Sequence, residues 1–145
     1  MIAIIQARNS SKRLPNKSML YYKKISVLER VINCVKRSKS IKKIIVATSK
    51  KKNDNTIVAL CKKKNINIYR GSLKNVSSRF YNILKLYNSK YFLRVCADSP
   101  FLDYKLIDIS IKKIYKKKID IVTNVFPRTF PTGQPVELVK PKTFL

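Results

Sequence analysis

The chain has 145 residues, 45% of them hydrophobic, and a formal net charge of +26 that arises from 33 Lys and Arg residues against 7 Asp and Glu residues. This length and apolar content suit one domain with one core. The lack of histidine excludes His-based acid–base catalysis and His metal ligands. No apolar run approaches the roughly 20 residues that span a bilayer, so we expect no membrane association.

The predicted elements alternate between strands and helices from the start of the chain. Residues 2–5 form a continuous apolar run, which is typical of a parallel strand buried on both faces. Ser26 and Glu29 have the spacing of a capping box, and the helix after Ser26 has apolar residues at i, i+3, i+4 and i+7. A strand over residues 43–48 and a helix over residues 54–64 follow.

The second half of the chain continues this alternation. Apolar residues at helical spacing predict helices around residues 80–87 and 107–114. The remaining runs predict strands over residues 66–69, 91–95, 120–123 and 136–139. This order predicts an α/β fold with a mostly parallel sheet and helices on both faces. In such sheets, ligands bind beyond the carboxyl ends of the strands.

The three cysteines give no sign of a metal or disulfide site. Cys34, Cys61 and Cys96 are too far apart in the sequence for a metal knuckle. Their odd number, and an N-terminus without the charged region of a secretory signal, indicate reduced thiols. We therefore expect a cytoplasmic protein whose cysteines lie in the core.

A loop rich in cations and hydroxyl groups follows the first predicted strand. Arg8, Arg13 and Lys17 lie close together in the sequence, and Ser10 and Ser11 add hydroxyl groups. Charged side chains and exposed backbone N–H groups suit the oxygens of a triphosphate. The alternative is a solvated surface turn.

A carboxylate follows the predicted strand at 91–95. Asp98 comes just before Ser99 and Pro100. Its position suits Mg²⁺, which prefers one or two protein carboxylates together with substrate phosphates. The alternative is a turn that Asp98 forms through its own hydrogen bonds. Asp103 is predicted to cap the helix that follows.

Four blocks of the sequence, in order, resemble the cytidylyltransferases that make CMP-activated sugars. Residues 4–17 meet every fixed position of I-I-x-A-R-x-x-S-x-R-L-P-x-K. The other blocks resemble G-x-x-x-D-V-L-x-R-F at 71–80, R-x-x-x-D-x-P at 94–100 and T-N-x-x-P-R-T-F-P-x-G-x-x-V-E at 123–137; the first of these departs at Asn75 and Ser77. The most similar branch is named for spore-coat polysaccharide synthesis, and the acylneuraminate and ketodeoxyoctonate cytidylyltransferases are related.

The resemblance implies a Rossmann-like fold of the nucleotide-diphospho-sugar transferase type, with residues 1–145 forming a single nucleotidyltransferase domain. Because relatives continue well beyond this length, the chain is expected to be C-terminally truncated, the N-terminal part of a longer fold whose full-length form is a homodimer. The implied reaction moves CMP from CTP to a sugar of an acidic or cell-surface polysaccharide type, with release of pyrophosphate. Mg²⁺ is the implied cofactor.

The resemblance also implies roles for single residues. Asp98 would hold Mg²⁺, and Arg13, Lys17 and Asp98 would be catalytic. Arg79 would donate to O2 and N3 of cytosine, or would pair with a surface carboxylate instead. The full set expected to bind the nucleotide is Ala7, Arg8, Ser10, Ser11, Arg13, Lys17 and Arg79.

Two residues of the last block would meet the sugar. Arg128 and Glu137 are the implied substrate-binding residues. For Arg128, the alternative is that it lies in an ordinary Pro/Gly turn with no role in binding. For Glu137, the alternative is an ion pair with a lysine.

Two other functions remain open. The positive charge suits a non-enzymatic module that binds RNA or another polyanion. However, the Lys triplets at 50–52, 62–64 and 116–118 lie near predicted element ends without interleaved aromatic residues, as on a solvated surface, so no specific nucleic acid is expected. The second is an inactive, truncated homologue.

Overall fold

The computed structural model describes residues 1–144 and has a central sheet of six strands, in the order β5-β4-β1-β6-β8-β7. Four strands run parallel: β1 (Ile2–Gln6), β4 (Lys43–Ser49), β5 (Asn67–Gly71) and β6 (Phe92–Cys96). Two short strands, β8 (Glu137–Val139) and β7 (Ile121–Thr123), extend the sheet in antiparallel fashion beside β6. The predicted mostly parallel sheet is therefore confirmed.

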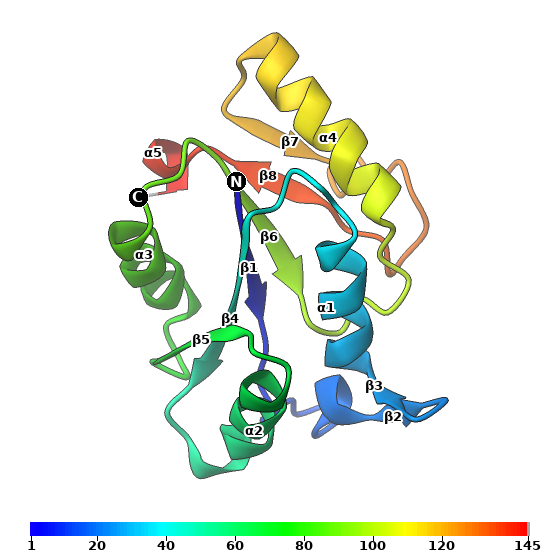
Figure 1. The fold of residues 1–145 in the computed structure, drawn as a ribbon, viewed down its shortest axis with the longest axis vertical. Helices are drawn as coiled ribbons and strands as arrows, with labels where there is room; N and C mark the ends of the chain where they lie inside the picture. The colour runs from blue at the N-terminus through cyan, green and yellow to red at the C-terminus, as the bar shows by residue number, and fades with distance from the viewer. Residues whose placement is uncertain (145) are drawn as a thin grey trace.

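Helices cover both faces of the sheet, as predicted. One face packs against α1 (Val27–Lys36), α2 (Asn55–Lys63) and α4 (Tyr104–Lys117), and the other against α3 (Val76–Leu86) and the short α5 (Pro141–Phe144). Figure 1 shows the sheet between these layers, with α3 and α5 on one side and α1 and α4 on the other. Alternate residues of β1 enter the two cores, Ala3 and Ile5 on the α1 side and Ile2 and Ile4 on the α3 side. This two-sided burial explains the continuous apolar run in the sequence.

Side-chain caps set the start of three helices. The Ser26 hydroxyl accepts a hydrogen bond from the Glu29 N–H at 3.2 Å, which confirms the Ser26 half of the predicted capping box. The Glu29 carboxylate instead forms an ion pair with Lys64. Asp103 caps α4 by accepting from the Lys105 N–H at 2.9 Å. Asn75 caps α3 in the same manner, so the cap survives where the family pattern has Asp.

A hairpin between β1 and α1 was not predicted. Its strands are β2 (Tyr21–Tyr22) and β3 (Ile25–Ser26), and the turn residues Lys23 and Lys24 have φ angles of 48° and 66°. Asn-Gly or a similar pair is the usual signal for such a turn, and two lysines do not give it. The predicted helix over 54–64 also differs, because residues 52–54 form a separate 3₁₀ turn before α2 begins.

The register of the parallel strands places the ends of β1 and β6 side by side. Gln6 pairs with Cys96, and the Ala97 N–H donates to the Gln6 carbonyl at 3.0 Å. Strand order reverses here, since the chain passes from β1 to β4 and β5 on one side and then returns to β6 on the other. Ligands of open α/β sheets bind at such a point.

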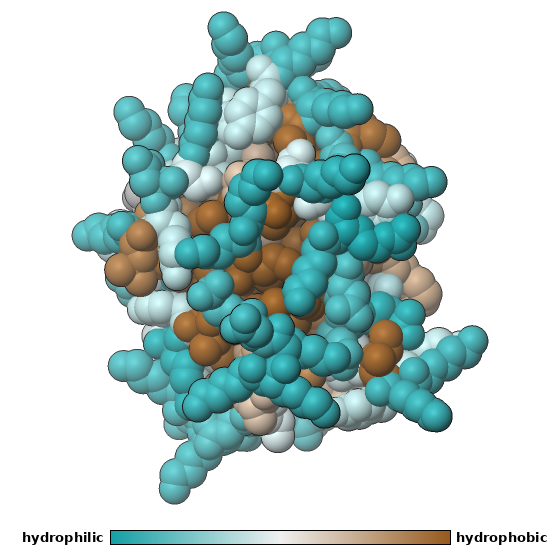
Figure 2. Space-filling model, in the orientation of Figure 1, coloured by the Kyte–Doolittle hydropathy of each residue, from teal (hydrophilic) through white to brown (hydrophobic). Residues whose placement is uncertain are grey.

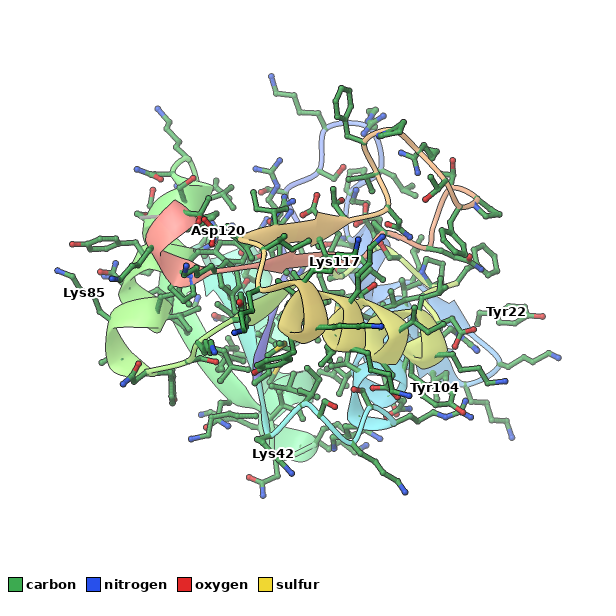
Figure 3. The ribbon with its side chains drawn as sticks, turned by 90° about the horizontal axis from the view of Figure 1, so that it is seen from above. Tyr22, Lys42, Lys85, Tyr104, Lys117 and Asp120 are labelled. Atoms are coloured by element: carbon green, nitrogen blue, oxygen red, sulfur yellow. The ribbon has the colours of Figure 1, made fainter. Side chains whose placement is uncertain are left out.

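The surface is covered by long polar side chains. On the face drawn in Figure 2, hydrophilic side chains surround a central apolar area and are not gathered into one strip. In Figure 3, Lys85 and Tyr22 lie at the outer edge of the molecule and point away from it. Within residues 1–144, no helix is both long and apolar enough to cross a membrane.

Candidate functional site

The loop after β1 is held at both ends by one residue, Asn9. Its carbonyl accepts from the N–H groups of Ser11 and Asn16, at 3.0 and 2.9 Å. Its side-chain amide donates to the Asn53 carbonyl at 2.6 Å and to the Thr56 hydroxyl at 2.8 Å. The loop that carries the predicted cations is therefore fastened to the start of α2.

A buried carboxylate completes this attachment. Asp54 is fully buried and accepts the Asn9 N–H at 2.8 Å through one oxygen. Its other oxygen accepts from the backbone N–H of Ser49 at 3.2 Å and from the Ser49 hydroxyl. Asp54 thus joins the loop to the end of β4, a role that its position at a predicted helix start did not indicate.

A cavity of about 190 Å³ opens where the ends of β1 and β6 meet. It brings together the predicted residues Ala7, Arg8, Lys17, Arg79 and Asp98, which come from four separate segments of the chain. Ser18, which was not predicted, lies in the same wall. We call this hollow the first cavity.

The remaining loop residues line a second hollow beside the first. This second cavity, of about 430 Å³, is formed by Ser10, Ser11 and Arg13 together with Lys12, Leu73 and Lys74. Arg8 and Lys17 line both cavities. Two hollows that share two cations in their walls can accommodate a ligand with a compact end and a polyanionic end.

Lys17 and Asp98 form an ion pair at the mouth of the first cavity. The Asp98 carboxylate is exposed, so a cation other than Lys17 can reach it. Among residues 1–144, no group of three or more His, Cys, Asp or Glu side chains converges. One carboxylate with substrate phosphates still fits Mg²⁺, which keeps several waters and needs few protein ligands.

Arg79 forms an inner wall of the first cavity and is only 1% exposed. Its Nη1 donates to the Ser72 carbonyl, and no ion pair within residues 1–144 involves it. A surface carboxylate therefore does not hold it. Gly71 makes room for this side chain, since a Cβ there would lie 2.8 Å from the Arg79 Cγ.

Burial lowers the pKa of Arg79, and the nearby charge of Arg8 lowers it further, while the charge of Asp54 opposes both effects. A guanidinium still remains protonated under ordinary conditions. Two cations close to one cavity favour an anion or an electron-rich group as its guest.

Unsatisfied polar atoms concentrate around this site. Within residues 1–144, five buried side-chain atoms have no hydrogen-bond partner: Asn9 Oδ1, Ser10 Oγ, Ser18 Oγ, Thr48 Oγ1 and Arg79 Nε. All but Thr48 belong to the loop region or to the first cavity. Such groups are costly unless something satisfies them.

The two residues predicted to meet the sugar do not line these cavities. Glu137 lies opposite Arg94 in the β6–β8 register and forms an ion pair with it, so its partner is an arginine and not a lysine. Both line a separate hollow that also includes Gln6. Arg128 is exposed in the connection between β7 and β8.

The prediction that the cysteines lie in the core holds for Cys61, which is buried, whereas Cys34 and Cys96 are only partly buried. Burial raises the pKa of Cys61 to about 12 and, with a contribution from Asp103, that of Cys34 to about 11. Burial also raises the pKa of Cys96, which lies in the wall of the first cavity. These thiols are free, as predicted, and unsuited to act as nucleophiles at neutral pH.

Comparison with known proteins gives a consistent result. Residues 2–142 match the family described as cytidylyltransferase. The chain is 42% identical over 123 residues to the uncharacterized protein MJ1063 of Methanocaldococcus jannaschii, covering 85% of this chain and 51% of that protein. It is 30% identical over 124 residues to the spore coat polysaccharide biosynthesis protein SpsF of Bacillus subtilis, covering 83% and 52%. The chain thus spans about half the length of these relatives.

Two solved structures share the fold. A cytidylyltransferase from Leptospira borgpetersenii superposes with a TM-score of 0.93 at 29% identity, over 99% of this chain and 61% of that one. CMP:2-keto-3-deoxy-manno-octonic acid synthetase in complex with CTP superposes with a TM-score of 0.76 at 10% identity, over 99% of this chain and 75% of that one. At that identity the second likeness is one of fold.

Proposed function

The chain belongs to the cytidylyltransferase family, and from this we propose that it transfers CMP from CTP to a sugar hydroxyl and releases pyrophosphate. The observation that carries the proposal is the pair of adjoining cavities at the meeting point of β1 and β6, with Arg8 and Lys17 common to both. A nucleoside triphosphate has this form, a compact nucleoside followed by a polyanion.

The first cavity takes the nucleoside end. The resemblance of the 71–80 block to the family supports a contact between Arg79 and cytosine, and the burial of Arg79 supports it further. Its unpaired Nε–H can only donate. Cytosine offers acceptors at O2 and N3, whereas uracil has a donor at N3.

The second cavity takes the β- and γ-phosphates. Arg13 offers a fork of donors, and Ser10 and Ser11 offer hydroxyl groups. Arg8 and Lys17 line both cavities, which supports a contact with the α-phosphate. In the reaction, the acceptor hydroxyl attacks the α-phosphorus and the bond from that phosphorus to the bridging oxygen of the β-phosphate breaks. The acceptor hydroxyl loses its proton to solvent water, and Arg13 and Lys17 offset the charge that builds on the leaving pyrophosphate.

Mg²⁺ remains a prediction, which the exposed carboxylate of Asp98 supports. If bound, the ion would be held by Asp98 and substrate phosphates, and it would supply charge neutralisation at the leaving group. Lys17 would then separate from Asp98, and the phosphates would replace Asp98 as its anionic partner.

The acceptor is proposed to be a sugar, in keeping with the name of the SpsF relative. Arg128 and Glu137 remain the candidates for contact with it. Since Glu137 is paired with Arg94 across the strands, this pair offers a sugar both acceptors and donors. Neither residue lies in the two nucleotide cavities, which leaves room for a second substrate on the β8 side.

The direct test is nucleotide selectivity measured by calorimetry. We expect CTP in the presence of Mg²⁺ to bind more tightly than UTP, ATP or GTP. A polyanion-binding module would instead bind all four alike, with an affinity that falls steeply as salt is raised.

A further inference from the structure

Ser18 lies in the wall of the first cavity yet has no partner for its hydroxyl group. It belongs to the 3₁₀ turn Lys17–Met19 and is 2% exposed. Its Oγ is one of the buried atoms without a hydrogen bond. The first cavity, whose wall includes Ser18, offers space for a partner.

Thr48 shows that a buried hydroxyl group without a hydrogen-bond partner need not lie beside a cavity. Thr48 on β4 is fully buried, and its Oγ1 is also unpaired. Thr48 lines none of the hollows that adjoin the site. Its full burial within β4, away from these hollows, indicates a packing role for Thr48.

We propose that Ser18 is a substrate-binding residue whose hydroxyl bonds the nucleoside monophosphate half of the nucleotide. The inference rests on the proposed function and adds a contact that the sequence motifs do not contain. Ser18 lines the first cavity and not the second, whereas Ser10, Ser11 and Arg13 line the second and not the first. Its partner is therefore in the part that CTP shares with CMP.

The unpaired hydroxyl of Ser18 is also expected to lower the stability of the ligand-free protein while it raises the affinity for nucleotide. An unsatisfied buried hydroxyl destabilises the ligand-free protein, so its removal leaves that protein equally or more stable. The same removal deletes a bond in the complex. A residue with only a packing role would show the opposite, a loss of stability without a selective loss of affinity.

The test compares Ser18→Ala with Thr48→Val, using calorimetry with CMP, CTP and pyrophosphate and thermal melting without ligand. For Ser18→Ala we expect affinity for CMP and for CTP to fall by the same factor, about fivefold for one hydrogen bond. Affinity for pyrophosphate and the melting temperature should not fall. Thr48→Val should bind all three ligands as the unchanged protein does.

Unchanged affinity of Ser18→Ala for CMP and CTP overturns the proposal, and so does an equal loss for pyrophosphate. Failure of the unchanged protein to bind CTP or CMP would overturn the proposed function itself. The measurement on the unchanged protein therefore distinguishes failure of the Ser18 proposal from failure of the proposed function.

Discussion

Lys17 and Asp98 lie 81 residues apart in the sequence and form an ion pair between the loop after β1 and the end of β6. The pair joins two of the four blocks that resemble the family, residues 4–17 and 94–100. Both groups have a part in the proposed reaction, since Lys17 is proposed to bind phosphate and Asp98 to bind a metal ion. On this proposal the ion pair opens when substrate binds, so that Lys17 binds phosphate and Asp98 binds the metal ion.

Replacement of Asp98 by Asn separates these two roles. Without a divalent ion, we expect Asp98→Asn to bind CTP more tightly than the unchanged protein, because Lys17 is freed and a negative charge is removed. Addition of Mg²⁺ should then improve CTP affinity in the unchanged protein by about 1.5 kcal/mol, the value of one bond to a charged group, and leave the variant unaffected. Calorimetry at several Mg²⁺ concentrations measures both effects.

The matched control is Asp120→Asn, which breaks the exposed ion pair with Lys140 outside the two cavities. It should leave both affinities unchanged. An equal response to Mg²⁺ in Asp98→Asn and the unchanged protein would return Asp98 to the role of a turn former.

Arg13 is expected to contribute more to CTP affinity than a lysine of the surface triplets. It lines the second cavity and can form charge-assisted bonds to phosphate oxygens. Arg13→Ala should weaken CTP binding by about 1.5–3 kcal/mol, while Lys63→Ala on α2 should have little effect. Similar losses in both variants would show that net charge, and not the loop, binds the nucleotide.

Asp54 is expected to position the phosphate-binding loop. In Asp54→Asn one buried N–H, of Asn9 or of Ser49, loses its acceptor, which should destabilise the protein by about 1–3 kcal/mol. Because the loop is freed from β4, affinity for pyrophosphate should fall more than affinity for CMP. Chemical denaturation and calorimetry give the two values.

Asp103→Asn serves as the control for this substitution, because Asn caps a helix as well as Asp does. It should change neither stability nor binding. If Asp54→Asn lost stability while it kept its affinity for pyrophosphate, Asp54 would have only a structural role.

The hairpin turn offers a test of backbone strain. Lys24 has a φ angle of 66°, a conformation in which a residue with a Cβ is disfavoured by about 1 kcal/mol relative to Gly. Lys24→Gly should raise stability by about that amount. Lys24→Ala removes the same charge but keeps the Cβ, so it should give no gain; an equal gain in both variants would point to charge repulsion as the cause.

The sequence predicted the parts of the fold that depend on local pattern. Continuous apolar runs predicted β1, β4 and β6, and the caps at Ser26 and Asp103 predicted the starts of α1 and α4. The hairpin at Lys23 and Lys24 was not predicted, because both residues have positive φ angles, which lysine does not prefer.

The residues of the candidate site were likewise predicted only in part. Arg8, Lys17, Arg79 and Asp98 were expected together and line one cavity. Asn9, Asp54 and Ser18 were missed, since their roles come from contacts between distant segments and not from any motif. The pairing of Glu137 with Arg94 likewise follows from strand register, which the sequence does not specify.

The most direct test of the central claim is pyrophosphate release by the purified protein with Mg²⁺, measured for each of the four ribonucleoside triphosphates across a panel of acidic and neutral sugars. The account predicts release with CTP that depends on one class of sugar and yields one CMP-sugar for each pyrophosphate, identified by mass spectrometry. Release that is independent of the sugar, or equal for all four nucleotides, would contradict it.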